Sequence, residues 1–207
     1  MRYNPITKLR SVLPALLIAL LLNACATPKA ITINGNAAAN VNPDNHGKPL
    51  SVVLHVYQLK SPDSFNKLTF DDFMSGKTAA ELIGDPLLAD KEVILVPGGT
   101  ASVAESVKPE AHYIGVIGFF RKPDEHMWRL LLNADDVRSK GLNLTAEECY
   151  LKANNIKPVA IPGQPATYSP SCQAFMQKAK QEEKHENYAK KYKYRHKPFI
   201  AKTKPKE

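Results

Sequence analysis

The sequence predicts a mainly β protein: an antiparallel β-sandwich with a small helical insertion, following a signal peptide that is cleaved. Between residues 30 and 132, short apolar segments are separated by clusters of Gly, Pro, Asp and Asn. Several short strands at this spacing are typical of a sandwich. In residues 61–90 the apolar side chains change from a period of two to one nearer 3.6, and Thr69 and Thr78 suit helix starts. We therefore expect two or three short helices between strands.

The predicted strands contain most of the apolar residues of this region. The first, residues 30–38, places Ile31 and Ile33 on one face. Residues 50–59 alternate between apolar and polar positions, as a half-buried strand does. Further strands are expected at residues 91–96, 100–107, 113–120, 127–132 and 154–161. Because residues 113–120 are apolar on both faces, this strand is expected at the centre of a sheet.

Residues 1–24 have the layout of a lipoprotein signal peptide. The first ten positions hold three basic residues and no acidic one, and an apolar run follows at residues 12–22. This run is too short to span a bilayer, which needs about 20 apolar residues. It ends in the sequence LNAC, which resembles the bacterial lipobox, so Cys25 is the expected lipidation site. An ordinary signal peptide cut elsewhere is the alternative.

A lipidated Cys25 would anchor the protein stably, because the lipobox resemblance implies three acyl chains. Each buried CH₂ contributes about 0.8 kcal/mol, and a single chain holds only marginally. Ala26 stands where an Asp usually signals retention in the inner membrane, so we expect the outer membrane, facing the periplasm. Residues 25–30 form a short tether that reaches only about 18 Å when extended. The sandwich should therefore lie close to the lipid surface.

The net charge of +8 is concentrated in residues 173–207. This tail holds 11 Lys and Arg against 4 Asp and Glu, whereas residues 26–172 hold 14 against 16. A solvated extension, partly helical or disordered, is the simplest interpretation. The alternative is attachment to an anionic neighbour: peptidoglycan, lipid phosphates or an acidic partner face. A periplasmic location argues against nucleic acid.

Two cysteines remain once Cys25 is assigned to lipid. Cys149 and Cys172 form an even pair, and a disulfide is the expected state in an oxidising compartment. It would stabilise the fold by about 3 kcal/mol in the chain-entropy model. Metal binding is disfavoured because the two lack C-x-x-C spacing. The ordered sandwich should therefore extend over residues 31–172.

Motifs for catalysis are absent from the sequence. It contains no G-x-S-x-G, H-E-x-x-H, P-loop or G-x-G-x-x-G pattern. Two pairs of adjacent carboxylates occur at residues 71–72 and 135–136, but neighbours in a helix or strand point in different directions. The four histidines in residues 46–126 lack ligand-like spacing. We predict no catalytic, cofactor or metal site, and a binding protein instead of an enzyme.

Five segments in order resemble the TssJ family, the outer-membrane lipoproteins of type VI secretion systems. They are NPDNHGKP, VVLHVYQLKS, SFNKLTFDDF, DPLLADKEVILVPGG and YIGVIGFFRKPDEHMWR, between residues 42 and 129. Their order, their spacing and their place behind a lipobox make the resemblance specific. It implies a transthyretin-like β-sandwich with a small helical addition. It also implies a role: anchoring the trans-envelope complex by binding the periplasmic C-terminal region of the inner-membrane protein TssM.

In that family the loop between the first two strands carries much of the TssM contact, and here this loop is residues 40–48. If successive strands run antiparallel, residues 97–99 and 121–126 lie at the same end. Loops held by a rigid scaffold often carry binding residues. The predicted partner-binding residues are Asn40, Asn42, Asp44, Asn45, His46, Lys122 and Asp124.

Two other interpretations of the loops and of the whole protein stay open. The loop residues could be merely solvated turns, and the sandwich could instead bind a small ligand, a glycan or peptidoglycan. A periplasmic hydrolase is disfavoured because no nucleophile is paired with a base.

Overall fold

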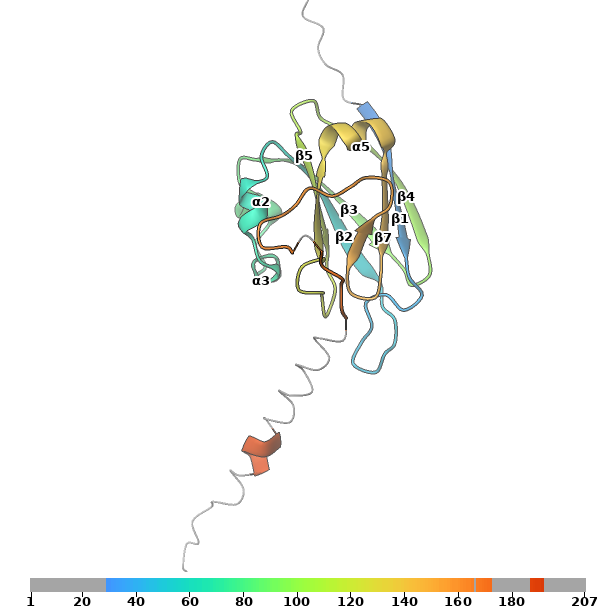
Figure 1. Cartoon of the computed structure of the whole chain (residues 1–207), viewed down its shortest axis with the longest axis vertical. Helices are drawn as coiled ribbons and strands as arrows, with labels where there is room; N and C mark the ends of the chain where they lie inside the picture. The colour runs from blue at the N-terminus through green and yellow to red at the C-terminus, as the bar shows by residue number, and fades with distance from the viewer. Residues whose placement is uncertain (1–28, 166, 173–186, 192–207) are drawn as a thin grey trace, which may run out of the picture.

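The computed structural model describes residues 29–165, 167–172 and 187–191 (Figure 1). The predicted signal peptide, Cys25 and most of the tether lie outside the described residues. So does most of the basic tail, of which residues 187–191 are described and are helical.

Two four-stranded sheets make up the sandwich (Figure 1). The first has the order β4-β1-β7-β8, with bounds β4 (Thr100–Val107), β1 (Lys29–Ala37), β7 (Leu142–Ala146) and β8 (Leu151–Ala153). The second has the order β3-β2-β5-β6, with bounds β3 (Leu87–Leu95), β2 (Val52–Leu59), β5 (Tyr113–Gly118) and β6 (Arg129–Asn133). Neighbouring strands pair antiparallel, except β1 with β7. The predicted β-sandwich is confirmed.

The core lies between the two sheets and follows from the alternation of the strands. Ile33 of β1 and Leu54 of β2 are almost fully buried, as are the inward residues of the other strands. β5 is buried on both faces and lies between β2 and β6, so the prediction of a central strand is confirmed.

Three short helices form the insertion: α2 (Asp63–Lys67), α3 (Phe70–Met74) and α4 (Ala79–Ile83). Thr69 and Thr78 each close a capping box with the residue three positions later, which satisfies backbone N–H groups that short helices leave free. The insertion ends at Ile83 and not near residue 90. Residues 87–90 pair with the end of β2 and belong to β3, because ladder hydrogen bonds outweigh their irregular apolar spacing.

The last part of the sandwich differs from the prediction. Strand 154–161 is wrong: Val159 makes only an isolated bridge to Leu131. The chain between β6 and this segment instead forms the helix α5 (Ala134–Lys140) and two short strands, β7 and β8, which were not predicted. Asn133 caps α5 by accepting a hydrogen bond from the Asp135 N–H at 2.9 Å. None of the described helices has the length and apolar character needed to cross a membrane.

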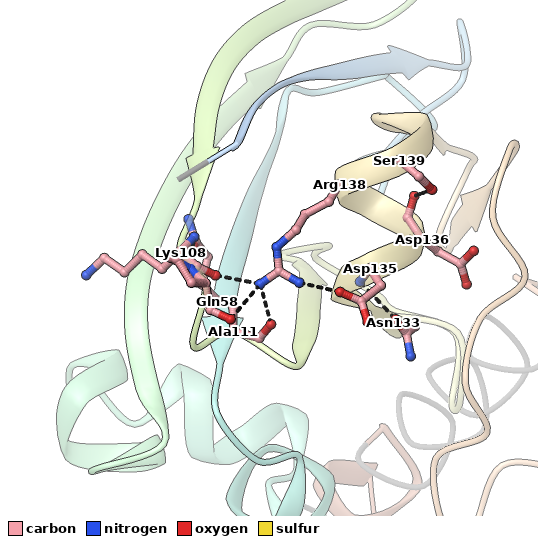
Figure 2. A network of polar contacts seen from close by, with 9 residues as sticks. Gln58, Lys108, Ala111, Asn133, Asp135, Asp136, Arg138 and Ser139 are labelled. Atoms are coloured by element: carbon pink, nitrogen blue, oxygen red, sulfur yellow. Dashed lines mark hydrogen bonds and ion pairs between the residues drawn. The ribbon is translucent and has the colours of Figure 1, made fainter. Parts of the chain in front are cut away.

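A polar network joins α5 to the β4–β5 connection (Figure 2). The Arg138 guanidinium donates to Asp135 at 2.6 Å and to the carbonyl oxygens of Lys108 and Ala111 at 2.6 and 2.7 Å. The buried amide of Gln58 accepts from the Lys108 N–H at 2.8 Å. This network closes the end of the sandwich at which β1 begins (Figure 1).

A second apolar cluster lies under α2, α3 and α4, on the outer face of the second sheet, and includes Tyr57, Phe65, Phe73 and Trp128. The guanidinium of Arg129 enters it, 4.9 Å from the Trp128 ring centroid. Its Nη1 donates to the carbonyl oxygens of Phe65 and Leu68, both at 2.6 Å. These carbonyls stand where α2 ends, so Arg129 caps that helix from the sheet, and burial lowers the pKa of its guanidinium.

We expect Arg129→Ala to lower the free energy of unfolding by about 3 kcal/mol, because buried carbonyls lose a charged donor and two rings lose a cation. Urea denaturation measures this change. Arg129→Lys keeps the charge but lacks the planar fork that reaches several carbonyls, so it should recover less than half of the loss. Equal urea midpoints for Arg129→Ala and wild type would refute the capping role.

Candidate functional site

The three predicted loops meet at one end of the sandwich, opposite the start of β1 (Figure 1). The Ala37 N–H donates to the Gly99 carbonyl at 2.9 Å, which joins the end of β1 to the turn 97–99. The Arg121 N–H donates to the Asn42 side chain at 2.7 Å, which joins loop 40–48 to loop 121–126. We call these three loops, with the turn 147–150, the loop end. The parallel pairing of β1 with β7 does not change which loops meet here. The connection from β6 to β7 through α5 lies at the other end of the sandwich.

Asn42 is an internal link of the loop end. Its side chain is 5% exposed, and its backbone has φ of 49°. The side-chain Nδ2 donates to the Ser51 carbonyl at 2.7 Å, while Oδ1 accepts from the Arg121 N–H. Asn tolerates this left-handed conformation better than most residues. The prediction grouped Asn42 with the partner-facing residues, but its polar atoms are used within the protein.

Asp124 is also buried, with 2% of its surface exposed. One carboxylate oxygen accepts from the N–H groups of His126 and Met127 at 3.0 and 2.8 Å. The other accepts from the Tyr168 hydroxyl at 2.7 Å and the Ser171 N–H at 2.9 Å. Asp124 therefore organises its own loop and holds a distant segment against it. Like Asn42, it positions the loop end and does not present its carboxylate to a partner.

The predicted disulfide is confirmed. Cys149 and Cys172 are bonded, with their Cα atoms 5.6 Å apart. Residues 161–165 and 167–172, which we call the strap, are held to the loop end by this bond and by Asp124. Within the strap, Gln164 donates to the His126 carbonyl, and the Tyr168 ring lies edge-on to the His126 ring with centroids 4.7 Å apart.

The tip of loop 40–48 projects from the sandwich and has a defined shape (Figure 1). Asp44 accepts from the N–H groups of His46 and Lys48 at 2.8 and 2.9 Å, and its own N–H donates to the Lys48 carbonyl at 2.9 Å. The two hydrogen bonds to the carboxylate lower the pKa of Asp44, which stays ionised at neutral pH. Asn45 and His46 are exposed at this tip.

The remaining predicted residues lie around the tip. Asn40 is exposed and its amide lies 3.4 Å from the Glu148 carboxylate. Lys122 is half-buried. The structure thus brings all seven predicted residues to one end, five with side chains at the surface and two inside.

Two surface residues at this end were not predicted. Ile94 near the end of β3 and Val96 just after it are each 55% exposed, next to the turn 97–99. The signal was available in the sequence: Val93 and Leu95 alternate inward, so Ile94 and Val96 must face outward. Exposed apolar side chains beside projecting loops are a common feature of protein-binding surfaces.

A shallow cavity of about 320 Å³ lies between the turn 147–150 and the strap. Its polar lining includes Glu147, Glu148 and Tyr150. Within the described residues, no group of three His, Cys, Asp or Glu side chains is arranged to hold a metal ion. Asp135 and Asp136 each pair with a separate cation of α5, Arg138 and Lys140.

The match to a family model decides the family. The model described as "Type VI secretion lipoprotein, VasD, EvfM, TssJ" matches residues 29–149. The chain belongs to this TssJ family. The family is described as one of lipoproteins, which supports membrane association of this chain. Comparison with curated proteins gives no match.

Solved structures of the type VI secretion apparatus share the fold. A chain in a structure described as "Type VI membrane complex" is 28% identical, with a TM-score of 0.56, over 61% of this chain and 98% of that one. A chain in a structure described as the TssM C-terminal domain (869–1107) from EAEC is 26% identical, with a TM-score of 0.53, over 62% and 99%. Serratia marcescens Lip, described as a membrane bound component of the system, is 23% identical, with a TM-score of 0.54, over 64% and 99%.

We expect Asn42→Ala to destabilise this TssJ-family protein by about 2 kcal/mol, because two buried hydrogen bonds are lost and Ala is strained at positive φ. Thermal unfolding and proteolysis of residues 40–50 measure the change. Asn45→Ala, three positions along the same loop, is the control and should stay within about 0.5 kcal/mol of wild type. Equal stability of both variants would contradict the internal role of Asn42.

Proposed function

We propose that this TssJ-family lipoprotein anchors the trans-envelope complex of a type VI secretion system to the outer membrane. Lipid on Cys25 holds it there, facing the periplasm, and the loop end binds the periplasmic C-terminal region of the inner-membrane protein TssM. The protein contributes no catalysis; it connects two parts of an assembly.

The direction in which β1 runs through the sandwich is the observation that carries the proposal. β1 starts at the end closed by α5 and runs to the loop end (Figure 1). Only three residues separate Cys25 from Lys29, so their Cα atoms lie at most about 14 Å apart. A lipid on Cys25 therefore holds the α5 end near the bilayer and leaves the loop end pointing away from it. A partner from the inner membrane approaches from that side.

The surface at the loop end suits a protein partner. Its projecting tip is kept in shape by Asp44, and rigid loops lose little conformational entropy on binding. Exposed polar side chains of loop 40–48 and two exposed apolar ones, Ile94 and Val96, lie at this end, and protein interfaces combine apolar and polar side chains in this way. The comparisons add support, because a chain with this fold occurs in a structure named for the TssM C-terminal domain.

Small-ligand binding is less well supported by the same surface. The cavity beside the strap is open and polar, whereas ligand sites are predominantly apolar and enclosed.

We expect the triple variant Asn45→Ala, His46→Ala, Lys122→Ala to bind the periplasmic C-terminal domain of the cognate TssM at least about 10-fold more weakly. Calorimetry measures the affinity, and thermal unfolding checks that the fold is intact. The control is Glu110→Ala, His112→Ala, two exposed residues of the β4–β5 connection at the α5 end, which should bind normally. Wild-type affinity in the folded triple variant would overturn the assignment of the loop end.

We expect Cys25→Ser to abolish secretion while leaving TssM affinity unchanged, because it removes the lipid and leaves the loop end intact. Cell fractionation should show the variant in the periplasm instead of the outer membrane. Loss of TssM affinity in purified Cys25→Ser protein would show that the lipid does more than anchor.

A further inference from the structure

The disulfide attaches the strap to the turn at which the long loops of the loop end meet. The Cys149 carbonyl accepts from the Asp124 N–H at 2.8 Å, and the carbonyl of Glu148 accepts from the Asn42 N–H at 2.8 Å. These two bonds fix the turn 147–150 to both long loops. The disulfide also lines a small hollow with two of the predicted partner-binding residues, Asp44 and Lys122. A change at this bond therefore reaches the proposed binding surface directly.

The strap depends on the disulfide to stay in place. Ile161 is 2% exposed in the second apolar cluster, but none of the described strap residues after it is fully buried. The hydrogen bonds that Tyr168 and Ser171 donate to Asp124 can be exchanged for bonds to water when the strap leaves. Each ordered residue of the strap also costs conformational entropy. The covalent bond is therefore what keeps the strap closed.

Opening of the strap would change the surroundings of Asp124. One carboxylate oxygen has the Tyr168 hydroxyl and the Ser171 N–H as partners, and both leave with the strap. The Asp124 side chain is 2% exposed while the strap is closed. Without the strap, water reaches this carboxylate and loop 121–126 loses a fixed support. Lys122, which belongs to this loop, is one of the residues proposed to contact TssM.

The two cysteines differ in their access to reagents. Cys149 is 3% exposed, whereas Cys172 is half-buried and lines the open cavity of about 320 Å³ beside the strap. In thiol–disulfide exchange a thiolate must reach the sulfur that it attacks. An external thiolate therefore forms its new S–S bond with Cys172. The electron pair of the broken bond leaves on the Cys149 sulfur, which takes up a proton.

We propose that the Cys149–Cys172 disulfide is a site of thiol–disulfide exchange that controls TssM binding, with the strap as its latch. The reactant is a dithiol–disulfide oxidoreductase of the periplasm. Its oxidised form takes two electrons and two protons from the two thiols and closes the strap. Its dithiol form attacks Cys172, and its second thiol then displaces Cys172 as a thiol, so that the oxidoreductase ends as a disulfide and the strap is open.

This inference rests on the proposed function, because TssM is the partner whose affinity the latch would control. The strap lies beyond the residues that the family model matches, which end at Cys149. Control through the strap would therefore be an addition to the matched domain.

The latch is tested without TssM, on the full chain in a non-ionic detergent. Chymotrypsin cleaves after accessible aromatic residues, and Tyr168 is half-buried in the closed strap. After reduction with dithiothreitol we expect cleavage at Tyr168 to be at least about 10-fold faster. Reduced glutathione followed by iodoacetamide should leave glutathione on Cys172 and the alkyl group on Cys149. Unchanged resistance of the reduced chain to chymotrypsin, or glutathione on Cys149, would overturn the proposal.

Control of binding is tested with the double variant Cys149→Ser, Cys172→Ser, which requires no reductant. Calorimetry should show at least about 10-fold weaker binding of the TssM domain, because the partner must then order the loop. The matched control is Thr167→Ala, Ser169→Ala, two exposed strap residues, which should bind within about 2-fold of the wild type. Thermal unfolding checks both folds. If the double variant does not fold, wild-type protein reduced and alkylated after folding replaces it.

Wild-type affinity in the folded double variant would overturn the control of binding by the latch. Failure of the oxidised wild type to bind TssM would count against the proposed function alone, because the chymotrypsin and glutathione assays do not involve that domain.

Discussion

β1 is the strand on which the rest of the sandwich depends. It pairs with β4 through eight residues and with β7 through five, so it lies inside its sheet with ladder bonds on both sides. Gly35 lets the opposite sheet approach closely, since a Cβ at that position would lie 2.9 Å from a methyl carbon of Leu95. Because β1 is central and spans the sandwich, the chain entering at one end must begin its first loop at the other. The separation of the proposed anchor from the proposed binding surface follows from this one strand.

Buried polar side chains turn the loop end into a rigid surface. Asn42 and Asp124 together accept or donate six hydrogen bonds, five of them with backbone groups. Loops without such links would have to be ordered by the partner, at a cost in conformational entropy. The disulfide adds a covalent link at the same place, and it constrains the unfolded chain as well as the folded one. The exposed tip can therefore vary in sequence while its support stays unchanged.

The sequence predicted the parts of the fold that depend on local pattern. The strand at residues 100–107 was placed correctly, and the caps at Thr69 and Thr78 were recognised, because alternation and capping are local signals. β7 and β8 were missed because they are only five and three residues long, and β7, which contains one Asn and one Thr, is held by a parallel partner more than 100 residues away. Asn42 and Asp124 resembled solvated loop residues, since their partners Arg121 and Ser171 lie 79 and 47 residues further along the chain. Burial of a polar side chain is a tertiary property, so the sequence predicted which loops share one end of the sandwich but not which of their side chains face outward.

The direction of β1 also determines how the protein would carry load in the proposed assembly. A lipid that pulls at Lys29 and a partner that pulls at loop 40–48 stretch the sandwich along the axis of this strand. The ladder bonds to β4 and β7 run across that axis, so they are loaded together in shear and are not opened one after another. The disulfide adds a covalent link between the strap and Cys149, three residues beyond the end of β7, so a force on the strap also reaches this sheet. In the proposed assembly the lipid and the partner would thus act at opposite ends of one continuous ladder, an arrangement suited to holding a large complex to a membrane through a small sandwich.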